Sequence, residues 1–72
     1  MEAKLIHVGK KGVTPELLRE ITDTLRKHKA VRIKMLKSAR AQSGRGEISE
    51  QILGKIKARR SELRGNILTL GV

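Results

Sequence analysis

The chain has 72 residues, of which 17 are Lys or Arg and 7 are Asp or Glu, so its formal net charge is +10 at pH 7. It contains no Cys, which excludes disulfide scaffolds, thiolate zinc sites and cysteine nucleophiles. It also contains no Phe, Trp or Tyr, which excludes the aromatic platforms that usually stack single-stranded bases. This composition favours contact with the phosphate backbone of a nucleic acid rather than with base faces.

The length predicts one domain over residues 1–72, with a small hydrophobic core. No segment approaches the roughly 18 consecutive apolar residues of a membrane span, and no leader-peptide pattern is present. A cytoplasmic location is therefore expected.

The first part of the chain predicts a strand, a loop and a helix. Lys4–Val8 is a short apolar run that ends at Gly9, which is typical of a strand. Residues 14–16 (Thr-Pro-Glu) combine an N-cap, a proline suited to the first helical position and an acid near the positive end of the helix dipole. Apolar residues then recur at helical spacing, which predicts an amphipathic helix over about 15–28.

The middle of the chain predicts a strand and then a loop. Ala30–Lys37 alternates apolar and basic residues, which indicates a half-buried strand with Arg32 and Lys34 on its outer face. Ser38–Gly46 has no periodicity and is rich in Ser, Gly and Arg, so a mobile loop is predicted there.

The last part of the chain predicts a helix and a hairpin. Glu47–Ala58 carries apolar residues at helical spacing, although Gly54 weakens the pattern. Ser61–Arg64 and Ile67–Val72 flank a Gly-Asn pair, which is typical of a two-residue β-hairpin turn.

The predicted element order is β-α-β-α-β-β. A strand–helix–strand unit favours parallel pairing of its two strands, and each helix has one apolar stripe. The sequence therefore predicts a two-layer α/β fold, in which two helices cover one face of a four-stranded mixed sheet. The opposite face would be open and would present Arg32 and Lys34.

Positive charge is concentrated in the middle of the chain. No acidic residue occurs between Asp23 and Glu47, although a solubilising surface normally mixes both signs. The acid-free segment contains Arg26, Lys27, Lys29, Arg32, Lys34, Lys37, Arg40 and Arg45. We interpret this block as a positively charged surface that binds a polyanion.

A short glycine motif stands between the first predicted strand and the first predicted helix. Gly9-Lys10-Lys11-Gly12 has the GXXG form of the loop with which KH modules clamp a nucleic-acid backbone. Two glycines allow close backbone approach, and the following helix start offers free N–H groups to an anion. A tight turn with two solvent-exposed lysines is the alternative interpretation.

Catalytic and cofactor-binding patterns are not found. The chain lacks both the nucleotide-hydrolase phosphate loop and a dinucleotide-binding fingerprint. His28 lies on the apolar arc of the first predicted helix without a nucleophile or acid partner, so a packed or helix-capping role is expected. His7 has no companion that suggests a metal site, and no serine belongs to a triad pattern. We expect a protein that is not an enzyme and needs no cofactor.

The segment I-H-V-G-K-K-G-V-T-P-E-L-L-R-E-I, followed by L-R-K-H-K-A-V-R-I-K-M-L, resembles the core of the CRM domain (chloroplast RNA splicing and ribosome maturation) in its single-domain prokaryotic form. The likeness covers about 1–37 well and 60–72 loosely, whereas 38–58 matches only in element type. Two features depart from the family pattern. The helix that usually precedes the first strand is absent, and Gly71 stands where a Tyr is often found.

The resemblance implies an RNA-binding module with a fold like the C-terminal domain of translation initiation factor three. It also implies binding of structured RNA, a link to precursors of the large ribosomal subunit, and backbone contact through the GKKG loop. Together with the basic strand and the arginine-rich loop, the predicted RNA-contact residues are Gly9, Lys10, Lys11, Gly12, Arg32, Lys34, Lys37, Arg40 and Arg45.

Other hypotheses stay open at this point. An Alba-type chromatin protein shares the strand–GKK–helix order and predicts a dimer that coats duplex DNA, but the G-V-T-P continuation differs from the usual K-P-x-x-N. An integral ribosomal protein or a protein-interaction module is also compatible with the small core. Membrane-surface binding is disfavoured because neither predicted helix combines a basic face with large apolar anchors. The sequence leaves the oligomeric state undetermined.

Overall fold

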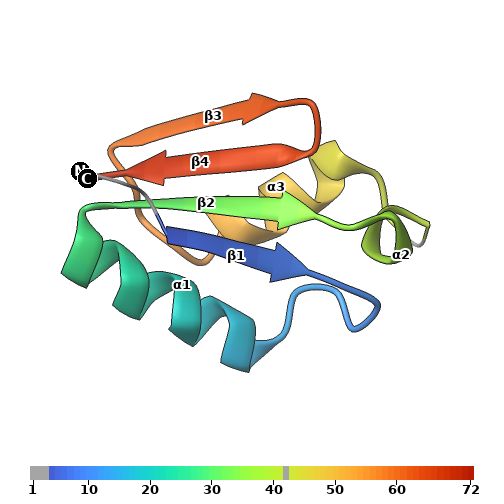
Figure 1. The fold of residues 1–72 in the computed structure, drawn as a ribbon, viewed down its shortest axis with the longest axis horizontal. Helices are drawn as coiled ribbons and strands as arrows, with labels where there is room; N and C mark the ends of the chain where they lie inside the picture. Colours follow the sequence, from blue (N-terminus) through green and yellow to red (C-terminus); the bar gives the residue numbers. More distant parts are fainter. Residues whose placement is uncertain (1–3, 42) are drawn as a thin grey trace.

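The computed structural model describes residues 4–41 and 43–72, and Figure 1 shows the arrangement of its helices and strands. The elements are β1 (Lys4–Val8), α1 (Pro15–His28), β2 (Ala30–Met35), α2 (Lys37–Arg40), α3 (Arg45–Leu53), β3 (Arg60–Arg64) and β4 (Ile67–Gly71). Among the described residues, no helix is both long and apolar enough to cross a membrane.

The strands form one mixed sheet in the order β1-β2-β4-β3. β1 pairs with β2 in parallel, whereas β4 pairs antiparallel with both β2 and β3. The first two strands need a crossover because they are parallel, and α1 supplies it. The last two strands are joined by the predicted two-residue turn, in which Gly65 has φ +56°. The predicted four-stranded mixed sheet and hairpin are confirmed.

Alternate residues of the inner strands build one side of the core. Ile6, Ile33 and Leu68 lie in one row across β1, β2 and β4, and each is at most 5% exposed. The helices contribute Ile21 from α1 and Ile52 from α3 to the same buried cluster. All three helices therefore pack on one face of the sheet, and no described helix covers the other face.

The boundaries of α1 match the sequence prediction because both ends are capped locally. The hydroxyl oxygen of Thr14 accepts a hydrogen bond of 3.1 Å from the backbone N–H of Leu17. At the other end Lys29 is left-handed (φ 66°), and its N–H donates to the carbonyl of Leu25. Of the two roles expected for His28, packing in the core is not found, because the residue is exposed. His28 is the last residue of α1 and one of the basic residues of its last turn, a position compatible with the helix-capping alternative.

The prediction of a mobile loop over Ser38–Gly46 is wrong for most of that segment. β2 ends at Met35, α2 covers Lys37–Arg40, and α3 begins at Arg45. A four-residue helix is too short to display a period in sequence, and α2 is stabilised because Ala39, at 3% exposed, packs into the core. Gln42, which also belongs to the predicted loop, lies outside the described residues.

The second long helix is shorter than the predicted Glu47–Ala58. α3 ends at Leu53, and Gly54 caps it by donating its N–H to the carbonyl of Glu50. Ile56 has the spacing of a helical residue and is buried (6% exposed), but it reaches the core from the connection between α3 and β3. The sequence therefore predicts a helix that is too long, because Ile56 is buried at a helical spacing although it lies beyond the end of α3.

Candidate nucleic-acid interface

The GKKG motif forms a closed turn between β1 and α1. The N–H of Gly12 donates a hydrogen bond of 2.9 Å to the carbonyl of Gly9, and Gly12 has φ +70°. Residues other than glycine rarely adopt this backbone conformation. Lys10 and Lys11 occupy the tip of the turn, and both are exposed. The motif thus presents two ammonium groups beside the start of α1.

The turn lies beside the start of α2 at one end of the sheet, the right-hand end in Figure 1. Parallel β1 and β2 finish at the same edge, and Leu36 donates its N–H to the carbonyl of Val8 at 2.9 Å. A Cβ atom on Gly9 would lie 3.9 Å from a methyl carbon of Leu36. These contacts bring the GKKG turn against the segment that carries Lys37 and Arg40.

The β3–β4 turn and the start of α3 reach the same end. The N–H of Met35 donates to the carbonyl of Asn66 at 2.8 Å, which fixes the hairpin turn beside the end of β2. A guanidinium N–H of Arg45 donates to the carbonyl of Gly65 at 3.1 Å. Seven exposed cations are therefore gathered here, and we call them the basic end: Lys10, Lys11, Lys34, Lys37, Arg40, Arg45 and Arg64.

Two guanidinium groups of the basic end are held by the backbone. Arg40 donates its Nε–H to the carbonyl of Met35 at 3.3 Å, and Arg45 is bound to Gly65 as described. A guanidinium carries five N–H donors, so each of these side chains keeps donors for an anion while one donor sets its position. The arginines are therefore partly preorganised, unlike the two lysines of the GKKG turn.

The uncovered face of the sheet continues from the basic end. Lys34 lies in a row with Arg64, separated from it by Ile67 on β4. Arg32 lies one row further back, where the corresponding residue of β3 is Glu62. Both predicted residues of β2 are exposed, as expected. Lys34 belongs to the basic end, whereas Arg32 lies in the middle of the face, in the row that also contains Glu62.

The sequence interpretation missed Arg64. The alternation of R-S-E-L-R places Arg60, Glu62 and Arg64 on one side of β3, and this alternation can be seen in the sequence. The order of the strands in the sheet does not follow from the sequence pattern. Only the tertiary structure places β4 beside β2 and so aligns Arg64 with Lys34. Arg64 also lies 3.3 Å from Glu62 in an exposed ion pair, which is weak in water.

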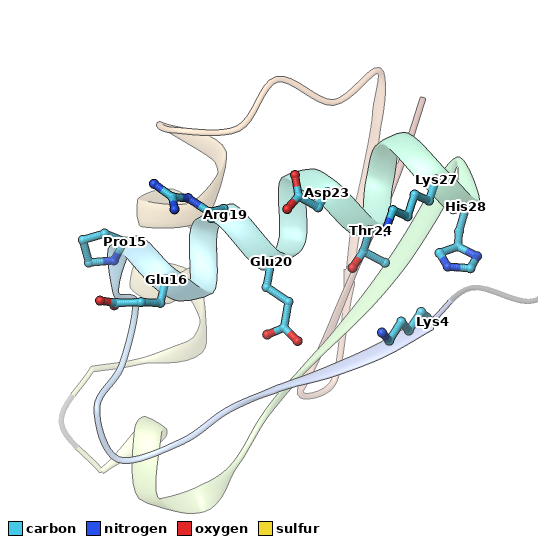
Figure 2. Close-up of a pocket in the computed structure, with 9 residues that line it drawn as sticks. All are labelled: Lys4, Pro15, Glu16, Arg19, Glu20, Asp23, Thr24, Lys27 and His28. Carbon is cyan, nitrogen blue, oxygen red and sulfur yellow. The ribbon is translucent and has the colours of Figure 1, made fainter.

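The exposed flank of α1 has a different character. A groove of about 620 Å³ runs along this helix. Its lining residues, drawn in Figure 2, include Glu16, Glu20 and Asp23, with Lys4 and His28 at its far end. Arg19 and Lys27 line the same groove as the carboxylates. We call the three carboxylates and these two cations the mixed flank. Its opposite charges largely cancel, so this flank presents no field of a single sign, unlike the basic end.

The described residues do not assemble the side chains of a metal site. Within residues 4–41 and 43–72, no group of three or more His, Cys, Asp or Glu side chains could hold a metal ion. The polar groups gathered at one end are cations, whose chemistry is that of anion recognition.

The family comparison agrees with this geometry. Residues 2–70 match the family model described as the CRS1 / YhbY (CRM) domain. The chain belongs to the CRM-domain family. CRM domains are RNA-binding domains, so this CRM domain joins a family whose ligand is a polyanion. No curated protein matches the chain.

Proposed function

We propose that this CRM domain binds structured RNA through the phosphate backbone, with the basic end as its principal contact surface. The observation that carries the proposal is the convergence of the GKKG turn, α2, the start of α3 and the β3–β4 turn at one end of the sheet. Family membership supports RNA as the polyanion.

The mode of recognition follows from the side chains present. Lys and Arg neutralise phosphates without reading base edges, and the chain has no aromatic residue for base stacking. Affinity is therefore expected to depend weakly on RNA sequence and steeply on salt. If about six phosphates are neutralised, log K falls against log salt with a slope of roughly −4 to −5.

We further propose that the RNA is a precursor of the large ribosomal subunit and that the protein acts in assembly of that subunit. The support is the likeness to prokaryotic single-domain CRM proteins. Sedimentation of cell extracts through a gradient tests this role. Association with precursor particles, but not with mature subunits, is the expected result, whereas constant stoichiometry on mature ribosomes would indicate an integral ribosomal protein.

The test of the contact surface is the double variant Lys10→Ala/Lys11→Ala. Both side chains are exposed, so the fold should be preserved. Fluorescence anisotropy against a large-subunit RNA hairpin across a KCl series should show weaker binding to every RNA tested, and the salt slope should decrease in magnitude by about two.

The matched control is Arg19→Ala/Lys27→Ala, which removes the same charge from the mixed flank. This control should change the salt slope by much less than the GKKG variant. Equal effects of the two double variants would mean that only net charge matters, and the contact surface would then be wrong. Competition with duplex DNA distinguishes RNA binding from chromatin-type coating, because a coating protein should prefer the DNA.

A further inference from the structure

A basic groove lies at the end of the molecule opposite the basic end. It opens between the C-terminal half of α1 and the connection from α3 to β3, and its volume is about 420 Å³. The groove is lined by Thr22, Leu25, Arg26, Lys29, Lys55, Ile56, Lys57 and Val72. This volume falls within the range of small-molecule sites in proteins.

The rim of this groove carries one sign of charge. Arg26 comes from α1, Lys29 from the residue that caps α1, and Lys55 and Lys57 from the connection after α3. All four are exposed, and none of the described lining residues is acidic. The groove on the mixed flank of the same helix, by contrast, is lined by both signs. The charge of the rim selects an anion.

The floor of the groove is apolar. Leu25 is 4% exposed and Ile56 is 6% exposed, and both belong to the core cluster. Val72 lies at the rim and is 52% exposed. A ligand that joins an anionic group to an apolar surface matches this rim and floor.

The backbone that carries the cations is held in place. The carbonyl of Lys29 accepts a hydrogen bond of 3.0 Å from the N–H of Val72. In the connection after α3, the N–H groups of Lys55 and Ile56 both donate to the carbonyl of Ile52, at 3.1 and 2.9 Å. The groove is therefore formed by ordered backbone before any ligand binds, which lowers the entropy lost on binding.

We propose that this groove binds one unpaired nucleotide of the RNA held by the basic end, so this inference rests on the proposed function. The phosphate lies among the lysines, the base lies against Leu25 and Ile56, and the guanidinium of Arg26 stacks on the base. An acidic side chain supplies the charge but no apolar surface for the floor, whereas the face of a base supplies one. α1, which is 14 residues and about 21 Å long, begins beside the GKKG turn and lines this groove with its C-terminal half.

The first test uses adenosine 5′-monophosphate as the probe. In NMR titrations of the ¹⁵N-labelled full chain, the nucleotide should shift the amide signals of Leu25, Lys29 and residues 55–57 at lower concentration than inorganic phosphate does. Shifts confined to the basic end would overturn the proposal. Equal concentration dependence for the nucleotide and for phosphate would also overturn it, because the base would then make no contact.

The second test uses two RNA hairpins that differ by one bulged nucleotide. Lys55→Gln/Lys57→Gln should weaken binding to the bulged hairpin by about fivefold and should affect the fully paired hairpin less. Val72→Asp, which places a carboxylate at the rim of the groove, should have the same selectivity. The control Arg19→Gln/Lys27→Gln removes equal charge from the mixed flank and should not distinguish the two hairpins.

The two proposals can fail separately. If Lys10→Ala/Lys11→Ala weakens binding to both hairpins and the groove variants do not distinguish them, the groove proposal is wrong and the proposed function stands. If no variant at either end weakens binding, both are wrong. Groove-dependent binding of polyglutamate or of phosphatidylglycerol vesicles, without nucleotide shifts, would overturn the assignment of a nucleotide.

Discussion

A guanidinium N–H of Arg45 donates a hydrogen bond of 3.1 Å to the backbone carbonyl of Gly65, a residue 20 positions away in the sequence. The bond joins the first turn of α3 to the β3–β4 turn. Because the β3–β4 turn is also bonded to the end of β2 through Asn66 and Met35, the bond from Arg45 links three segments of the basic end. Each of these segments contributes cations to the same surface.

Replacing Arg45 should separate its structural role from its electrostatic one. The bond to Gly65 is exposed, so Arg45→Ala should lower the free energy of unfolding by only about 0.5 kcal/mol, measured by urea denaturation. The RNA salt slope should decrease in magnitude by about one. If the free energy of unfolding fell by several kcal/mol while the RNA salt slope stayed unchanged, Arg45 would stabilise the fold without contacting RNA.

Arg64 should contribute to RNA binding although its ion pair contributes little to stability. Arg64→Gln is expected to weaken RNA binding and to change the free energy of unfolding by less than about 0.5 kcal/mol, since exposed ion pairs are weak. Arg60→Gln is the matched control, because Arg60 lies on the same face of β3 but pairs with Gly71 at the other end of the strand. Anisotropy titrations in which both variants behave alike would remove Arg64 from the basic end.

Gly12 should be intolerant of a side chain for reasons of backbone conformation. A Cβ atom at Gly12 meets no atom within 4 Å, but its φ of +70° disfavours any other residue. Gly12→Ala is therefore expected to lower the free energy of unfolding by about 1 kcal/mol and to weaken RNA binding by distorting the turn.

The control for Gly12 is Gly46, which lies inside α3 without a positive φ and also has free space for a Cβ atom. Gly46→Ala should raise the free energy of unfolding by up to about 1 kcal/mol, because alanine favours helices. A gain in stability for both variants in urea denaturation would contradict the role given to the conformation of Gly12.

The cap of α1 gives a prediction on stability alone. Thr14→Ala removes the hydroxyl that accepts from the N–H of Leu17, so the free energy of unfolding should fall by about 1 kcal/mol. Thr14→Ser keeps an acceptor at this position and should retain most of that stability. If the serine variant were as unstable as the alanine variant in urea denaturation, the hydrogen bond would not be the stabilising contact.

The elements with strong local signals were predicted well from sequence. α1 has a cap, a proline at its first position and four turns of apolar period, and its predicted bounds agree with Pro15–His28. The Gly-Asn turn likewise specified the β3–β4 hairpin. The region from 37 to 58 was predicted poorly, because α2 has only four residues and because Ile56 is buried without being helical. Burial, rather than local propensity, determines the structure there.

The candidate site also has features that the sequence predicts and features that depend on the tertiary structure. The GKKG turn and the outward direction of Arg32 and Lys34 follow from residue type and from alternation along one strand, so the sequence alone determined them. The alignment of Lys34 with Arg64 depends on β4 lying between β2 and β3. The groove between α1 and the α3–β3 connection depends on packing between segments about 30 residues apart. Only the tertiary structure decided these juxtapositions, because they result from many weak non-local contacts that no periodicity within a single segment records.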